Sequence, residues 1–473
     1  MSDTPWLGDS CSLVDAFRRG ERSPVEELQA TYAAIDASEL NAFCFTPREE
    51  ALAAAAKADV SLPFGGVPVG VKELDPVEGW PYTDACVVFE DRVAPHTSIM
   101  VERIRDQGGA VLAGLTTASE FGGVNVTRTV LHGVTRNPWN TERTPGGSSG
   151  GTASAVAGGL VTIATGGDGG GSIRIPAGFT GLFGLKATFG RIPRGPRAPI
   201  GNITVTIGCL SRSVRDTARW YDVCNGYDGR DQFSLPRVEG WERDLGTHVE
   251  SLRGLRVAVV ADWGGATVAP AMWQQLEAAA DRLIAAAGMV RVDGIDTSLP
   301  NMGAAWGISG GIGTYAQLAE FWPECKDVLT PEIRGGMRVT QERYDLDARV
   351  KIEQRRVELN DRLARIFDVS HGGVDLVMTA SNPDVAFAAE GPLPTEFGGI
   401  SAGAGNNGRL TFPANMHGNP AISVPAGTLD GLPIGLQVIG RHHTDQQLLD
   451  IGLVVERNEP WPLVAPAAAT SFT

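Results

Sequence analysis

The sequence predicts an α/β protein in which helices pack on a central β-sheet. Short apolar runs between turn signals, such as residues 66–72 and 255–261, are typical of buried strands. They alternate with longer segments of helical periodicity, such as residues 269–287, whose apolar residues recur every three or four positions. This alternation continues along the chain, and no internal repeat or sharp change of composition divides it.

In the first half of the chain, Ser23, Pro24 and Glu26 form a capping box with proline at the first helical position. They predict a helix that runs to about Asp36. Residues 66–72 then predict a buried strand. The next elements expected are a helix over residues 97–107, a strand over 110–112 and a closely packed buried helix in the Ala- and Gly-rich run 152–164.

In the second half, residues 255–261 and 290–292 predict strands on either side of a helix over 269–287, which Gly288 ends. The apolar runs 421–425 and 434–439 are joined through Asp430-Gly431, a sequence typical of a β-hairpin. Residues 226–254 are rich in turn signals and predict a surface connection.

Composition narrows the class of protein. The chain has 473 residues, 42% of them hydrophobic, and a net charge of −15, which argues against a nucleic-acid partner. No signal peptide or membrane span is expected. The six cysteines are irregularly spaced and predict reduced thiols in the cytoplasm. The only adjacent histidines, His442 and His443, do not form a metal-ligand pattern, so we expect neither a metal nor a cofactor.

Two serine-glycine clusters carry the chemical signal. One surrounds Ser148 and Ser149 in residues 145–151, and the other precedes Ser172 in residues 166–172. Glycines let the backbone approach a substrate closely, and several N–H groups aimed at one point can stabilise the oxyanion that forms in acyl transfer.

These clusters resemble the signature of the amidase signature family, serine amide hydrolases. Ser172 lies 24 residues after Ser148, inside Gly-Gly-Ser-Ile-Arg-Ile-Pro-Ala. The resemblance implies that Ser172 is the nucleophile and that Ser148, held by a cis peptide, is the proton relay. Lys72, in Gly-Val-Lys-Glu, is the implied base. Further similar stretches, at residues 136–140, 184–191, 209–216 and 413–425, extend the resemblance over nearly the whole chain.

The same resemblance implies roles for the loop before the nucleophile. The backbone N–H groups of Gly169, Gly170, Gly171 and Ser172 would form the oxyanion hole, and Asp168 and Arg174 would support the loop. Several positions depart from the family pattern. Position 169 is Gly where Thr or Ile is usual, Glu73 replaces the commoner Asp, and Leu115 and Ala187 stand where Lys and Pro are usual. None of these changes removes a catalytic group.

The expected chemistry agrees with these residues. Serine is a weak nucleophile that needs a base, and lysine acts as a base only when burial lowers its pKa. Lys72 follows an apolar strand, which provides such burial. We therefore expect hydrolysis of a small-molecule carboxylic amide through an acyl-enzyme on Ser172. Related hydrazide, urea or ester linkages remain open as substrates, because fold and catalytic residues do not fix the substrate.

The resemblance also implies the architecture: one large domain with a mixed, twisted β-sheet flanked on both faces by helices. Its expected parts are a helical N-terminal part (1–62), a catalytic core (63–220), a variable substrate-side part (227–400) and C-terminal strands (410–460). A homodimer is compatible with the resemblance.

Four other interpretations compete. Gly-x-Ser-x-Gly occurs around Ser148, Ser149 and Ser309, which suggests an α/β-hydrolase with a catalytic histidine, but no strand is predicted before Ser148. The glycine pattern 403–408 lacks the βαβ context of a dinucleotide site and predicts a loop. The chain also resembles the amidase subunit of glutamine-dependent tRNA amidotransferases, although residues 190–197 differ from their usual sequence. A catalytically silent binding protein is disfavoured by the intact Lys72, Ser148 and Ser172.

Overall fold

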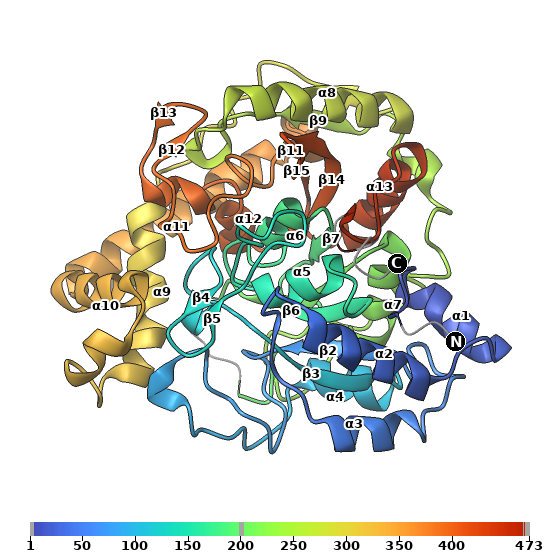
Figure 1. The fold of residues 1–473 in the computed structure, drawn as a ribbon. Coiled ribbons are helices and arrows are strands. Elements are labelled where there is room, and N and C mark those ends of the chain that lie inside the picture. Colours follow the sequence, from blue (N-terminus) through green and yellow to red (C-terminus); the bar gives the residue numbers. More distant parts are fainter. Residues whose placement is uncertain (1–3, 198–202, 467, 469–473) are drawn as a thin grey trace.

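The sheet at the centre of the molecule is mixed and has 11 strands in the order β1-β3-β2-β6-β8-β7-β14-β15-β11-β9-β10 (Figure 1). The computed structural model describes residues 4–197, 203–466 and 468, except for the side chains of residues 303–306, 308 and 309. The strands of the sheet are β1 (Phe43–Phe45), β2 (Pro68–Lys72), β3 (Val111–Thr116), β6 (Ile163–Asp168), β7 (Phe183–Lys186), β8 (Thr206–Ser211), β9 (Arg256–Val259), β10 (Val290–Arg291), β11 (Leu376–Ala380), β14 (Ala421–Leu429) and β15 (Leu432–Gly440).

Helices cover both faces of this sheet, as expected from the sequence. They are α1 (Ser10–Arg19), α2 (Pro24–Ala37), α3 (Arg48–Ala55), α4 (Ile99–Asp106), α5 (Gly150–Ala157), α6 (Arg174–Thr180), α7 (Val214–Cys224), α8 (Pro270–Ala287), α9 (Gly303–Leu318), α10 (Pro331–Arg343), α11 (Leu346–Ile366), α12 (Phe412–His417) and α13 (Asp445–Asn458). Two short hairpins lie outside the sheet: β4 (Arg128–Thr129) with β5 (Gly133–Val134), and β12 (Glu396–Phe397) with β13 (Ile400–Ser401).

Two apolar cores lie on opposite faces of the sheet. Ile163 and Ala164 are consecutive in β6, so their side chains point to opposite faces. Ile163 packs into the larger core, which includes residues of α1, α4, α7, α8 and α13. Ala164 packs into the second core, with residues of α2, α3 and α5. Burial on both faces explains why the central strands are apolar runs rather than alternating sequences.

Several predicted local features are present. Both hydrogen bonds of the Ser23–Glu26 capping box form at the start of α2. Gly288 ends α8 with a left-handed backbone. Asp430 and Gly431, both with positive φ, join the antiparallel strands β14 and β15, which confirms the predicted hairpin.

Two predictions needed correction. The run 152–164 is not one helix: α5 ends at Ala157, and Ile163 and Ala164 belong to β6. The helix ends at Gly158 and Gly159, of which Gly159 has a positive φ. The segment 1–62 is also not entirely helical, because Phe43–Phe45 forms the edge strand β1.

Residues 295–350, for which the sequence predicts no element, contain α9, α10 and the start of α11. Of the turn-rich residues 226–254, Trp241 is only 2% exposed and stacks on Tyr221, so this connection contributes to the core as well as to the surface. Within the described part of the chain, no helix combines the length and apolar character needed to cross a membrane.

Candidate active site

Two parallel neighbouring strands end next to each other at the site. β2 ends at Lys72 and β6 ends at Asp168, and the two strands pair in parallel with Val69 opposite Ile163. The backbone N–H of Lys72 donates to Thr165 Oγ1 at 2.8 Å, which links the two strand ends. Thr165 Oγ1 in turn donates to Asp75 Oδ2 at 2.7 Å. The polar groups therefore gather at the carboxyl ends of the parallel strands.

The Lys72 amine is buried against two hydroxyl groups. Its Nζ lies 2.8 Å from Ser148 Oγ and 2.9 Å from Ser149 Oγ, and the residue is 2% exposed. Burial lowers the pKa of Lys72 to about 8, although the carboxylates of Asp75, Asp168 and Glu73 act in the opposite direction. An appreciable fraction of this lysine is therefore neutral near pH 7.

The serine pair lies at the start of α5. The peptide bond between Gly147 and Ser148 is cis, as the resemblance implied. The Ser148 carbonyl accepts a hydrogen bond from Ser119 N at 3.1 Å. Ser149 Oγ donates to the Gly167 carbonyl at 3.3 Å, which connects the pair to β6. The contact of Ser149 with Lys72 was not expected from the sequence.

Ser172 lies in the turn between β6 and α6 and is partly buried. Among the described residues, no hydrogen bond involves its hydroxyl group. The structure thus brings Lys72 and Ser148 into contact but does not form a Ser148–Ser172 hydrogen bond. Catalytic hydrogen bonds are often long in the absence of substrate and tighten when it binds.

The loop before Ser172 is held by Asp168. Asp168 Oδ1 accepts from Gly171 N at 2.8 Å, and Oδ2 accepts from Ile173 N at 3.2 Å. Gly171 has a φ of +133°, and a Cβ at this position would collide with Thr411 Oγ1 and lie 2.6 Å from Ile175 Cδ1. Within the described residues, the N–H groups of Gly169, Gly170 and Ser172 donate to no protein acceptor. Three of the four predicted oxyanion donors are thus free to bind a substrate oxygen, whereas the N–H group of Gly171 already donates to Asp168.

Arg174 neutralises the buried Asp168 carboxylate. Its Nε and Nη2 donate to the two carboxylate oxygens at 3.0 and 2.9 Å, and both side chains are fully buried. Burial raises the pKa of Asp168, but the charge and hydrogen bonds of Arg174, together with Lys186 and Asn415, outweigh burial and hold that pKa well below its usual range.

Residues far along the chain complete this network. Arg174 Nη1 donates to Thr411 O at 2.9 Å and to Gln437 Oε1 at 2.5 Å, and Nη2 donates to Asn415 Oδ1 at 2.6 Å. Thr411 Oγ1 also donates to Gly170 O at 2.5 Å. No spacing pattern in the sequence indicated Thr411 or Gln437. Asn415 lies within one of the stretches that carry the family resemblance.

A second buried lysine does not share the features of Lys72. Burial lowers the pKa of Lys186 to about 7, but its Nζ donates to the Ala187 carbonyl at 3.0 Å. Among the described residues it has no hydroxyl partner. Lys72 is therefore the better candidate for a base.

His417 and His442 do not take part in a Ser-His-Asp arrangement. His417 Nδ1 lies 2.5 Å from Asn419 Oδ1, and His442 Nε2 lies 2.7 Å from the His417 carbonyl. In the part of the chain that the structure describes, neither ring bonds to a serine hydroxyl. The residues of the 403–408 glycine pattern form a loop with a short 3-10 helix at Ala404–Gly408, as predicted.

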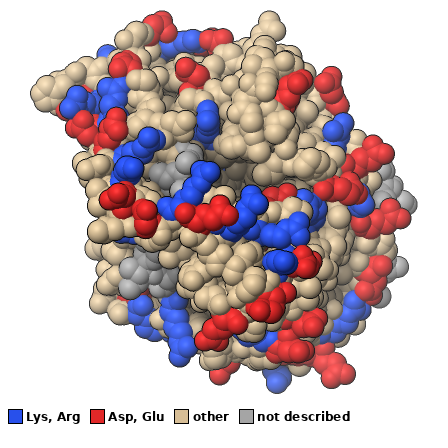
Figure 2. Space-filling model, turned by 90° about the vertical axis from the view of Figure 1, so that its left-hand side faces the viewer, with Lys and Arg blue, Asp and Glu red and all other residues tan. Residues whose placement is uncertain are grey.

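Helix α10 packs near the serine pair. Glu120, next to Ser119, accepts hydrogen bonds through Oε2 from Thr330 N and Oγ1, at 2.9 and 2.5 Å. Arg128 pairs with Glu332 at 2.7 Å. Figure 2 shows the molecule from the side on which α9 and α10 lie in Figure 1, with acidic and basic side chains next to each other across the middle of that face.

Comparison with known families identifies the class of protein. The family model described as Amidase matches residues 25–449, so the chain belongs to the amidase family. The predicted resemblance and fold are confirmed by solved structures. A bacterial aryl acylamidase of the amidase signature family superposes with a TM-score of 0.88, at 26% identity and 98% coverage of both chains. A 6-aminohexanoate cyclic dimer hydrolase has a TM-score of 0.84, at 26% identity, and covers 98% of this chain and 99% of its own.

Curated relatives include proteins named as a subunit of glutamyl-tRNA(Gln) amidotransferase. The protein from Chloroflexus aggregans is 32% identical, and the alignment covers 96% of this chain and 97% of that protein. The protein from Methanosarcina barkeri is 31% identical, with 96% and 98% covered. The solved structure of the protein of the same name from Thermotoga maritima has a TM-score of 0.71, at 25% identity and 94% coverage of both chains. The alternative named from the sequence thus has direct support among the relatives.

Proposed function

We propose that the chain hydrolyses a carboxylic amide of a small molecule through an acyl-enzyme on Ser172. The observation that carries this proposal is the 2.8 Å contact between the buried Lys72 amine and Ser148 Oγ. A lysine whose pKa lies near 8 can accept a proton at physiological pH, which a solvated lysine cannot do efficiently.

The proton path follows from the contacts of Lys72. Ser149 Oγ donates its hydrogen to Gly167 O, so it accepts one hydrogen from Lys72 Nζ. The lone pair of the neutral amine is then directed to Ser148. In the acylation step, Ser172 Oγ attacks the amide carbon and passes its proton to Ser148 Oγ, while the Ser148 proton moves to Lys72. The leaving amine takes a proton back along the same path, and water then hydrolyses the ester formed on Ser172.

The developing oxyanion needs fixed donors. We assign these to the N–H groups of Gly169, Gly170 and Ser172, because Gly171 N already donates to Asp168. Asp168 and Arg174 are positioning residues that hold the loop. Glycine at position 169, in place of Thr or Ile, leaves more space beside this loop, where a Cβ added to Gly169 would lie 3.1 Å from Val205 Cγ2.

A second candidate function is that of an amidase subunit in a glutamine-dependent tRNA amidotransferase. The relatives with that name, at 31–32% identity over 96% of this chain, favour it. It would use the same catalytic residues, but inside a complex and with tRNA as the eventual acceptor. The departure of residues 190–197 from the usual sequence of those subunits favours the first candidate instead. A cytoplasmic location and the absence of a nucleic-acid partner remain predictions from the sequence.

The test uses the purified chain with a panel of amides, hydrazides, ureas and esters, and with glutamine. We expect turnover of at least one amide by the chain alone, and an acyl group on the peptide that contains Ser172 after rapid quenching. Ser172→Ala should abolish both signals. Ser251→Ala changes an exposed serine in the 3-10 helix Val249–Leu252 and serves as the matched control.

The outcomes separate the candidates. Turnover that survives in Ser172→Ala contradicts the proposed nucleophile. Glutamine hydrolysis that appears only when amidotransferase partner subunits are added, with no turnover of any compound by the chain alone, supports the second candidate over the first.

A further inference from the structure

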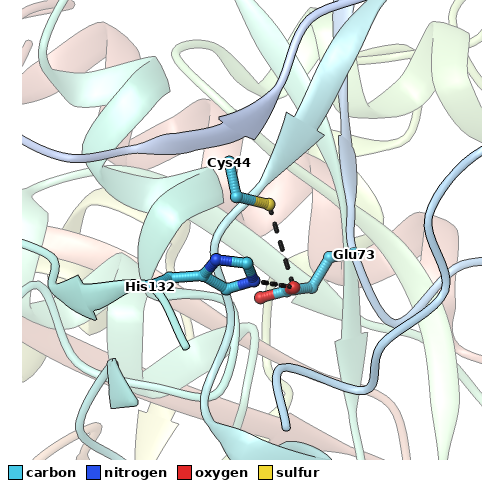
Figure 3. Close-up of side chains that lie close together, drawn as sticks. All are labelled: Cys44, Glu73 and His132. Atoms are coloured by element: carbon cyan, nitrogen blue, oxygen red, sulfur yellow. Dashed lines mark hydrogen bonds and ion pairs between the residues drawn. The ribbon is translucent and has the colours of Figure 1, made fainter. Parts of the chain in front are cut away.

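Three side chains with metal-binding chemistry meet beside the strand that carries Lys72. They are Cys44 in β1, Glu73 directly after β2 and His132 in the turn between β4 and β5 (Figure 3). Their ligand atoms, one sulfur, one oxygen and one nitrogen, all lie within 4.8 Å of one another. The three residues are far apart in the sequence, so the spacing of cysteines and histidines gave no indication of this cluster.

The three side chains converge on one oxygen atom. Glu73 Oε2 lies 2.8 Å from His132 Nε2 and 3.8 Å from Cys44 Sγ. Around a tetrahedral zinc ion, ligand atoms at the usual bond lengths are roughly 3.3–3.6 Å apart. The observed separations lie on either side of this range, so shifts of about 1 Å would bring the three atoms into a ligand geometry.

The surrounding backbone holds the three side chains in place. Glu73 Oε1 accepts from Ala118 N at 2.8 Å, which leaves Oε2 directed at the cluster. Thr83 Oγ1 also donates to Oε2, at 3.3 Å. The Cys44 thiol has a second acceptor, the Leu115 carbonyl, at 3.5 Å.

The turn that carries His132 is fixed in the same way. Asn41 Nδ2 donates to the His132 carbonyl at 2.7 Å, and His132 N donates to Thr129 Oγ1 at 2.8 Å. Asn41 lies just before β1, so this contact ties the histidine turn to the strand that carries Cys44. Ligands held by a supporting shell bind a metal ion with less loss of freedom.

The buried carboxylate lacks a strong cationic partner. Glu73 is 1% exposed, and among the described residues no lysine or arginine lies within ion-pair distance of it; His132 is its only such contact. A buried carboxylate is costly unless a cation or several hydrogen bonds compensate its charge. The His132 side chain is 18% exposed, which gives an ion a route in from solvent.

A second group of possible ligands does not have this character. Asp9, Cys11 and Asp216 also lie close together, but every carboxylate oxygen there already accepts a hydrogen bond. Asp216 accepts from Ser10 N and Cys11 N, at 2.8 and 2.9 Å. Asp9 accepts from Ser12 N and Ser213 Oγ, at 2.8 and 2.9 Å. Three of these four donors are backbone N–H groups at the start of α1, and the fourth is the Ser213 hydroxyl at the start of α7. In the first cluster, by contrast, two of the donors to Glu73 Oε2 are themselves potential ligands.

We propose that Cys44, Glu73 and His132 form a binding site for a divalent metal ion of the zinc class, with water as the fourth ligand. The combination of thiolate, imidazole and carboxylate is typical of borderline-soft ions such as Zn²⁺ and Co²⁺ rather than Mg²⁺ or Ca²⁺. On binding, the Cys44 thiol releases its proton to solvent, and the neutral His132 ring carries its proton on Nδ1 so that the Nε2 lone pair faces the ion. Among the described residues, none of the three ligands bonds to the Lys72 amine or to Ser148 Oγ, and Glu73 acts on Lys72 only through its charge.

The first experiment titrates the full, chelator-stripped chain with Co²⁺ under a phosphine reductant. We expect one ion per chain, with the near-ultraviolet charge-transfer absorption that reports a thiolate–Co²⁺ bond, and displacement of this absorption by Zn²⁺. Cys44→Ser should lose the band and bind Zn²⁺ more than about 100-fold more weakly, because loss of even a supporting residue costs 10–100-fold in metal affinity. Cys325→Ser changes a cysteine outside the proposed site and should leave both signals unchanged.

A second measurement needs no variant. Saturating Zn²⁺ should slow alkylation of Cys44 in the unmodified chain, as followed by peptide mass spectrometry, because a coordinated sulfur is a poorer nucleophile. The proposal is overturned if no thiolate band appears with Co²⁺, if Cys44→Ser keeps the band, or if Zn²⁺ leaves the alkylation rate of Cys44 unchanged. None of these results depends on amide turnover, so failure here is distinguishable from failure of the proposed hydrolase activity.

Discussion

Lys72 Nζ lies 2.9 Å from Ser149 Oγ, a hydroxyl that also bonds to the carbonyl oxygen of Gly167 in β6. The second serine of the pair therefore fixes the amine that the first serine is proposed to use. Both serines are buried next to this lysine: Ser148 is 3% exposed and Ser149 is 0% exposed.

Replacement of Ser149 should weaken catalysis without ending it. Ser149→Ala removes one hydrogen bond that orients Lys72, a loss of about 1 kcal/mol, so kcat/KM should fall about fivefold. Ser148→Ala removes the relay itself and should cost about 10²–10⁴-fold. Steady-state kinetics on a substrate found in the panel measure both values, and equal losses in the two variants would contradict the division of roles.

Activity should depend on the protonation of Lys72. The amine acts as a base only when neutral, and its pKa is lowered to about 8. The value of kcat/KM should therefore rise about tenfold per pH unit below pH 8 and level off above it. Lys72→Arg keeps the positive charge but cannot lose its proton near neutral pH, so it should be inactive throughout. A profile that is flat between pH 6 and pH 9 would show that another group is the base.

Gly171 should not tolerate a side chain. Gly171→Ala places a Cβ against Thr411 Oγ1 and Ile175 on a backbone with a φ of +133°. We expect loss of most activity, because the clash displaces the loop that carries Ser172. Gly254→Ala, at a φ of +80° with no atom near the added Cβ, isolates the backbone cost, about 1 kcal/mol, and should stay active. Turnover and urea unfolding of the two variants provide the comparison.

Loss of the Asp168 charge should destabilise the fold. Asp168→Asn leaves the fully buried Arg174 guanidinium uncompensated, which costs about 3–5 kcal/mol of unfolding free energy. The pKa of Asp168 is lowered in the folded state, so its contribution is complete above the unfolded value near 3.9 and is lost as the pH falls through the folded value. Urea denaturation at pH 7 tests the first statement, and the start of the decline in the parent's unfolding free energy below about pH 4 tests the second.

The control for this variant is an exposed ion pair. The side chains of Glu250 and Arg253 are 88% and 71% exposed. Glu250→Gln breaks the contact between them and should leave the unfolding free energy unchanged. An Asp168→Asn protein as stable as the parent would mean that the buried pair contributes little beyond its shape.

The sequence predicted those features that depend on neighbouring residues. The capping box at Ser23 and the Asp430-Gly431 hairpin involve contacts over a few positions, and both are present. The resemblance led to Lys72 and Ser148, which the structure brings within 2.8 Å of each other. The roles of the site residues in catalysis remain predictions.

What the sequence missed depends on contacts between distant segments. The sequence indicated no role for Ser149, and its contact with Lys72 is seen only in the folded chain. Thr411 and Gln437 reach Arg174 across more than 230 positions, at 2.9 and 2.5 Å. The helix predicted over 152–164 failed for a different reason, because small apolar residues suit a buried helix and a buried strand equally well.

The hydrogen bonds from Arg174 to β15 and α12 have a consequence for dividing this protein into fragments. Gln437 and Asn415 both accept hydrogen bonds from the Arg174 guanidinium group. Arg174 in turn holds Asp168 and the loop before Ser172, which lie in the first half of the chain. A fragment covering residues 63–220 would contain every proposed catalytic group but would lack Gln437 and Asn415, which help to position the loop before Ser172. Minimal versions of this enzyme would have to retain its carboxy-terminal hairpin, and a split protein should regain its chemistry only when the two pieces reassociate.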